Sequence, residues 1–214
     1  MIYAYDKSYL DKARTALGRM LDFAVYELGY ELEKYWELFV TSEISSYFER
    51  GDFTVLVGRS GTELAYDVLS ESGLEVKRIT PRFKPDRSPE YWTGWALAYF
   101  QWESALSFSE ITRYVPIRQI CDLYYPYHEM DIRQFCDEIR RLYRLAKPET
   151  NLKLIRKASA LSQKMLADIS GVPVRTIQQY EQRQKNINRA SAEYLLLLSR
   201  ALNCEMSALL ENCN

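Results

Sequence analysis

The sequence predicts a mainly α-helical protein built of two domains, and three observations support this. Apolar residues recur at steps of three and four along most of the 214 residues. Helix-capping residues stand directly before several of these patterns. The charge is divided: residues 144–214 carry 11 Lys and Arg against 6 Asp and Glu (net +5), and residues 1–143 carry 17 against 23 (net −6). This asymmetry indicates a basic module joined to an acidic one.

The composition is that of a globular protein. The chain is 47% apolar and 27% charged, which excludes disorder over most of its length. No apolar run approaches the roughly 20 residues that a membrane span needs, and the first residues lack the pattern of a signal peptide. We therefore expect a cytoplasmic protein with no membrane partner.

The cysteines show no metal-ligand spacing. Cys121, Cys136, Cys204 and Cys213 form no CxxC or Cys/His pattern, and most of them lie within apolar helical patterns. We expect reduced cysteines, packed in the core or incidentally exposed, and neither a metal site nor a cofactor.

The first domain, residues 1–143, begins with helical patterns. One helix is expected over residues 9–28 and a second over 31–50, because each has apolar residues along one face. The segment "FTVLV" at 53–57 fits either a short strand or a buried extended stretch. Ser60 and Glu63 then have the spacing of a capping box, and they start another helix.

An aromatic stripe follows an irregular connection at residues 73–88. Ser88 is the expected N-cap and Pro89 the first helical residue. The stripe has helical spacing and consists of Trp92, Trp95, Tyr99 and Trp102. Such a stripe is typical of a core, and the alternative is a groove that binds a partner or a ligand.

The rest of the first domain also reads as helical. A second capping box is expected at Ser107 and Glu110, and a short helix opens at Pro116. An amphipathic helix, "DIRQFCDEIRRLYR", covers residues 131–144 and completes the domain. Residues 144–150, which include Pro148, are expected to be a linker.

Residues 151–214 form the second predicted domain. Ser162 is the expected N-cap of its second helix, and Gly171 ends that helix where a positive φ is needed. Pro173 then opens a third helix. Two helices joined by so short a turn are a helix-turn-helix.

Several residues together give this domain a family resemblance. They are "LSQ" at 161–163, Ala167, "SGV" at 170–172, Thr176, Ile177, Tyr180, Glu181 and "LLLLSRALN" at 195–203. With them, residues 152–211 resemble the DNA-binding domain of the phage-repressor type, the XRE or Cro/C1 family. The resemblance implies five helices, with the third in the major groove of operator DNA, and a homodimer on two half-sites. The sequence departs from the family pattern at Pro173, where Ser or Thr is common, so the third helix is expected to begin without a side-chain cap.

The third helix carries side chains suited to reading bases. If Ile177 and Tyr180 face inward, then Val174, Arg175, Gln178 and Gln179 face outward. Arginine pairs with guanine O6 and N7, glutamine with adenine N6 and N7, and valine contacts the thymine methyl group.

Further side chains are expected to contact phosphates and so to set the register on DNA. The complete set of expected DNA-binding residues is Gln163, Lys164, Val174, Arg175, Thr176, Gln178, Gln179, Arg183, Lys185 and Asn186. The alternative is a basic, solvated helix pair with no ligand, but it leaves the agreement of turn, core and outward chemistry unexplained.

Two hypotheses remain for the first domain. In one, the protein is an autoregulating, antitoxin-like repressor whose residues 1–143 bind a basic toxin. In the other, it is a free-standing repressor whose aromatic pocket senses a small molecule. An enzyme is not expected, because His128 is the only histidine and has no triad or metal-ligand set around it in the sequence. The glycines of "GRSG" also lack a phosphate-loop pattern.

Overall fold

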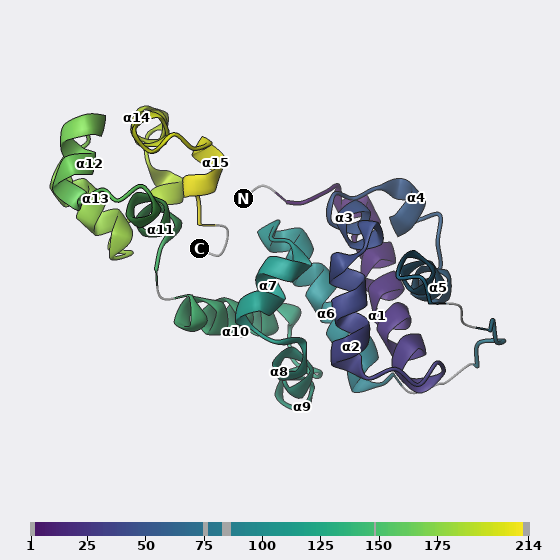
Figure 1. Ribbon diagram of the computed structural model, residues 1–214. Coiled ribbons are helices and arrows are strands. Elements are labelled where there is room, and N and C mark those ends of the chain that lie inside the picture. The colour runs from purple at the N-terminus through teal and green to yellow at the C-terminus, as the bar shows by residue number, and fades with distance from the viewer. Residues whose placement is uncertain (1–2, 75–76, 83–86, 148, 212–214) are drawn as a thin grey trace. The chain divides into compact units, whose positions relative to one another are not determined.

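A computed structural model describes residues 3–74, 77–82, 87–147 and 149–211 (Figure 1). Every regular element in these ranges is helical, so the prediction of a mainly α protein is confirmed. The chain divides into two compact units, Met1–Tyr143 and Arg144–Asn214. We call them unit 1 and unit 2.

Unit 1 is a bundle of long and short helices. In chain order they are η1 (Lys7–Tyr9), α1 (Leu10–Tyr26), α2 (Leu32–Thr41), α3 (Glu43–Glu49), α4 (Phe53–Leu56), α5 (Gly61–Glu71), α6 (Pro89–Ser104), α7 (Phe108–Tyr114), α8 (Ile117–Asp122), α9 (Tyr124–Tyr127) and α10 (Ile132–Ala146). Helix α1 is central, because it packs mainly against α6 and α5 (Figure 1).

Two glycines let α1 and α6 approach closely. A Cβ atom on Gly18 would lie 2.7 Å from the carbonyl oxygen of Tyr91, and one on Gly94 would lie 2.5 Å from that of Leu17. Both distances are shorter than van der Waals contact. The backbones therefore touch where the helices cross, and this contact fixes the position of α6 and its aromatic side chains.

Two expectations for unit 1 were wrong in detail. The helix expected over residues 31–50 is broken at Ser42, whose backbone is extended (ψ 157°) and whose Oγ accepts from the Ser45 N–H at 3.3 Å. The break arises because Ser42 caps α3 instead of continuing α2. The segment at residues 53–57 is neither a strand nor extended. It forms α4, which Asp52 caps by accepting from the Thr54 N–H.

Other local expectations are confirmed. Ser60 and Glu63 form a reciprocal capping box at the start of α5. Ser88 caps α6, with Pro89 as the first helical residue. Of the capping box expected at Ser107 and Glu110, the structure shows the first half: Ser107 caps α7 by accepting from the N–H of Glu110 at 3.1 Å. The Glu110 carboxylate accepts from the Tyr143 hydroxyl.

Unit 2 is a smaller helical bundle with its own core. Its elements are α11 (Asn151–Ala158), α12 (Gln163–Ser170), α13 (Val174–Glu181), η2 (Ile187–Arg189), α14 (Ala192–Leu202) and α15 (Met206–Leu209). The core residues come from all of them, and they are Leu152, Leu166, Val172, Ile177, Tyr180, Ile187, Leu198, Leu202 and Leu209.

The segment expected to be a linker is partly built into the helices. Helix α10 continues through Ala146, three residues into the range 144–150. Lys147 is buried, and its Nζ donates to Oδ1 of Asn151 at 2.9 Å. Thr150 is also buried, and its side chain caps α11. Pro148 lies outside the described residues.

Candidate nucleic-acid interface

The turn between α12 and α13 is set by three local features. Ser162 caps α12 by accepting from the Met165 N–H at 3.1 Å. Gly171 ends this helix with φ +73°, and its N–H donates to the Ala167 carbonyl at 2.8 Å. Pro173 stands at the N-cap of α13 and not at its first helical residue, and no side chain caps this helix. The expected uncapped start is thus confirmed.

Helix α13 has a buried face and an exposed face. Ile177 and Tyr180 are buried in the core of unit 2, as predicted. Burial also raises the pKa of Tyr180. On the opposite face Val174 and Arg175 are exposed, while Gln179 is half-buried. Because these outward residues lie in the first two turns of the helix, the N-terminal part of α13 offers them to a ligand.

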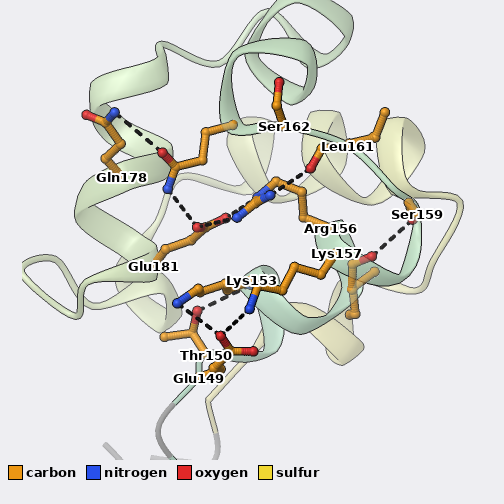
Figure 2. A network of polar contacts seen from close by, with 12 residues as sticks. Glu149, Thr150, Lys153, Arg156, Lys157, Ser159, Leu161, Ser162, Gln178 and Glu181 are labelled. Atoms are coloured by element: carbon orange, nitrogen blue, oxygen red, sulfur yellow. Dashed lines mark hydrogen bonds and ion pairs between the residues drawn. The ribbon is translucent and has the colours of Figure 1, made fainter.

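A buried ion pair ties α11 to the end of α13 (Figure 2). Nε of Arg156 lies 2.6 Å from Oε1 of Glu181, and Nη2 lies 2.9 Å from Oε2. Nη1 of Arg156 donates to the Leu161 carbonyl at 2.6 Å. The side chain of Glu181 is only 1% exposed. The hydrogen bonds to Glu181 raise the pKa of Arg156, although burial acts the other way.

The same carboxylate positions the start of α12. Nε2 of Gln163 donates to Oε2 of Glu181 at 2.8 Å. Oε1 of Gln163 lies 3.5 Å from Nε2 of Gln178, at the long limit of a hydrogen bond (Figure 2). The buried ion pair thus holds two of the predicted DNA-binding residues side by side.

Sequence reasoning missed the ion pair itself. No sequence pattern assigns a role to Arg156, and only the family resemblance singles out Glu181. The one available signal was an arginine within the apolar pattern of α11 and a glutamate next to the buried Tyr180. The partners are 25 residues apart, so no local spacing rule joins them.

The expected phosphate contacts divide into two groups. Lys164 and Lys185 are exposed. Arg183 has φ +56°, and its Nη2 donates to the Lys147 carbonyl at 3.0 Å. Asn186 caps η2 by accepting from the Asn188 N–H at 2.8 Å. The structure thus gives Arg183 and Asn186 contacts within unit 2 and leaves the two lysines extended toward solvent.

The other candidate sites in the described residues involve metal ligands, cysteines and His128, and they give less support for a function. No group of three or more His, Cys, Asp or Glu residues is placed to hold a metal ion within these ranges. Cys121 and Cys136 are buried and Cys204 is half-buried, all of them free, while Cys213 lies outside the described residues. His128 follows α9, as expected of a residue in a turn, with Nδ1 3.0 Å from the Tyr124 carbonyl.

No helix among the described residues is both long and apolar enough to cross a bilayer.

Comparison with known proteins assigns most of unit 2 to a family. A helix-turn-helix family model matches residues 152–209, which cover α11 to α15. Searches of curated proteins and of solved structures gave no match to the chain. The matched range contains the short turn between α12 and α13, the buried face of α13 and its exposed polar face. Residues 152–209 therefore belong to the helix-turn-helix DNA-binding domains of the phage-repressor (XRE, Cro/C1) type.

Proposed function

We propose that the protein is a transcription regulator that recognises one operator sequence with α13. The observation that carries this proposal is the division of α13 into a buried face and an outward set that contains Val174, Arg175 and Gln179. The inner face holds the helix in place. The outer face offers one guanidinium fork, amides and a small apolar group, which are the groups that distinguish base pairs in the major groove.

Phosphate contacts are assigned to the residues around α13. Lys164 and Lys185 are exposed cations that neutralise backbone phosphates. Gln163 donates a 2.8 Å hydrogen bond to Glu181 and lies at the N-terminal end of α12. The helix N–H groups at this end also favour an anion. These contacts set the register from which Arg175 reads a base.

A footprinting experiment tests the proposal. Full-length protein is incubated with its own promoter region and with an unrelated fragment of equal length, and both are treated with nuclease. We expect one protected stretch on the promoter only. Protection of neither fragment, or equal protection of both, would contradict sequence-specific recognition.

We further propose that the protein binds its operator as a homodimer. One α13 reads only a few base pairs, and exposed apolar residues on α14 and α15, Leu196 and Met206, offer a surface for a second copy. Two half-sites about 34 Å apart are then expected in the footprint, one helical turn of DNA. Sedimentation of the free protein as a monomer, together with a single protected half-site, would refute this assignment.

For unit 1 we propose binding of a basic partner protein, as in an antitoxin that controls its own operon. Its net charge of −6 favours association with a cationic surface, and Phe53 and Tyr125 are exposed aromatic residues that could anchor one. The test is co-expression with the product of the adjacent reading frame, with Phe53→Ser and Tyr125→Ser as variants. A stable complex that both variants weaken is expected, and the absence of a complex would reject the antitoxin role.

A second function for unit 1 is the sensing of a small molecule, and one observation favours it. The aromatic stripe of α6 lines a pocket with Trp92 and Trp95. In this case the purified protein binds the operator without a protein partner, and a metabolite either releases it from the DNA or strengthens its binding. A mobility-shift assay with and without a metabolite extract separates this alternative from the antitoxin role.

A further inference from the structure

Unit 1 contains a pocket of about 230 Å³ at the side of α6. We call it the α6–α9 pocket, and it is lined by Arg87, Tyr91, Trp92, Trp95, Tyr124 and His128. Of the predicted aromatic stripe, only Trp92 and Trp95 reach it. Trp102 instead stacks on Tyr3 and donates its Nε1–H to the Tyr5 carbonyl, and Tyr99 is half-buried beside Trp102.

The walls of the pocket are held in place by ring contacts. The rings of Trp92 and Tyr124 meet edge to face, with their centroids 5.7 Å apart. Trp92 also contacts Phe135 in the core at 5.1 Å. The ring of His128 stacks on Tyr124 at 4.4 Å. Such contacts restrict ring rotation, so a flat ligand meets walls that already have their final orientation.

The volume of the pocket indicates the size of the group that it can enclose. An apolar cavity of about 150 Å³ accepts benzene, and pockets for drug-sized molecules start at about 300 Å³. A pocket of about 230 Å³ lies between these values. It can enclose one aromatic ring or two fused rings, while the rest of a larger ligand would extend beyond its rim.

The charges around the pocket favour an anion. The guanidinium carbon of Arg87 lies 4.7 Å from the ring centroid of Tyr91, and that of Arg14 lies 3.3 Å from the ring centroid of Trp95. Two walls of the pocket therefore already carry a cation on a ring face. A cationic ligand would compete for these faces and be repelled, whereas an anion would be attracted.

The acidic groups nearby do not reverse this balance. No carboxylate is among the lining residues. Glu129 lies outside the lining, with Oε1 3.6 Å from Nε2 of His128, and Asp11 acts on Arg14 through space. Even so, Nε and Nη2 of Arg14 are buried without a hydrogen-bond partner among the described residues, so its charge is only partly compensated.

We propose that the α6–α9 pocket binds a small planar aromatic carboxylate. The ring system lies between the side chains of Trp92, Trp95 and Tyr124, and the carboxylate accepts hydrogen bonds from Arg87 at the rim. Arginine is suited to this role because its fork of N–H groups matches both oxygens of a carboxylate.

Calorimetry on the full-length protein without DNA tests the ligand class, so the result does not depend on DNA recognition. Three probes separate the contributions: indole-3-acetate has ring and carboxylate, tryptamine has the same ring with an ammonium group, and cyclohexylacetate has a carboxylate without an aromatic ring. We expect indole-3-acetate to bind at least about tenfold more tightly than either of the others, from one charge-assisted hydrogen-bonded pair. Equal or tighter binding of tryptamine, or no binding of indole-3-acetate at millimolar concentration, would overturn the proposal.

Two substitutions then test the assigned contacts. Arg87→Gln is expected to weaken indole-3-acetate about tenfold and to leave binding of unsubstituted indole unchanged. Arg113→Gln is the matched control, because Arg113 lies against Tyr114 on α7 and does not line the pocket. Trp95→Leu should weaken both probes, with the thermal midpoint and circular dichroism confirming that the variant is folded. An unchanged affinity of Arg87→Gln for indole-3-acetate would show that the carboxylate does not contact Arg87.

Discussion

At the scale of single residues, the Arg156–Glu181 pair links the stability of unit 2 to its proposed DNA contacts. Both side chains are buried, and each of their hydrogen bonds is within 2.9 Å. Taking two charges out of water is costly, so such a pair stabilises the fold only weakly against an apolar replacement. Removing one partner destabilises the fold strongly, because the other charge is then left buried without compensation.

Glu181→Gln is therefore expected to lower the free energy of unfolding of unit 2 by about 3 kcal/mol. The amide keeps the shape but not the charge that compensates Arg156. Denaturant unfolding followed by circular dichroism measures this loss. The control is Glu193→Gln in the first turn of α14, where the side chain is exposed and a change of at most about 1 kcal/mol is expected. Equal effects of the two substitutions would show that the ion pair is not buried as described.

At the scale of elements, the turn between α12 and α13 depends on the backbone conformation of Gly171. Its φ of +73° is in the left-handed region, and nothing lies within 4 Å of the position that a Cβ atom would occupy. Gly171→Ala is thus strained by conformation alone. We expect a loss of about 1 to 2 kcal/mol in the free energy of unfolding.

Gly94→Ala provides the contrasting case. Gly94 is helical, but an added Cβ would lie 2.5 Å from the Leu17 carbonyl oxygen, so α1 and α6 must separate. We expect a loss of about 3 kcal/mol and weaker binding of indole-3-acetate, since α6 carries three of the residues that line the pocket. Thermal unfolding of both glycine variants gives the comparison. A larger loss for Gly171→Ala than for Gly94→Ala would contradict this account of the helix crossing.

Elements were predictable from the sequence where their signals are local. The caps at Ser60, Ser88 and Ser162 were found because the cap and the N–H that it accepts from are within three residues of each other. The break at Ser42 was missed, since the apolar pattern runs on through both α2 and α3. The aromatic stripe of α6 was identified, but its division between the core and the α6–α9 pocket depends on Tyr124 and His128, some 30 residues later, which no local pattern reveals.

At the scale of the whole molecule, the difference in net charge between the units predicts which interaction salt weakens. Unit 2 has a net charge of +5 and unit 1 of −6, so screening should weaken DNA binding through unit 2. Lys185→Ala is expected to weaken binding to all DNA sequences alike and to reduce the slope of log affinity against log salt by about 1. Lys7→Ala, an exposed lysine of unit 1, is the control and should leave the slope unchanged. An unaltered slope for Lys185→Ala would remove Lys185 from the phosphate contacts.

The charge division also shows what composition could and could not predict. The basic character of unit 2 follows from counting residues once the chain is divided at the polar, proline-containing segment after residue 143. The ligand chemistry of unit 1 does not, because Arg14 and the ring of Trp95 beneath it come from segments far apart in the chain.

The most direct test of the central claim is the affinity of Arg175→Ala for the footprinted operator and for a scrambled duplex at one salt concentration. If Arg175 reads a base from the exposed face of α13, the substitution costs about 1 to 3 kcal/mol on the operator and relaxes the preference at one base pair. Binding to the scrambled duplex should then fall by no more than the loss of one phosphate-neutralising charge. An equal loss on both duplexes, with base preference unchanged, would contradict the proposed role of α13.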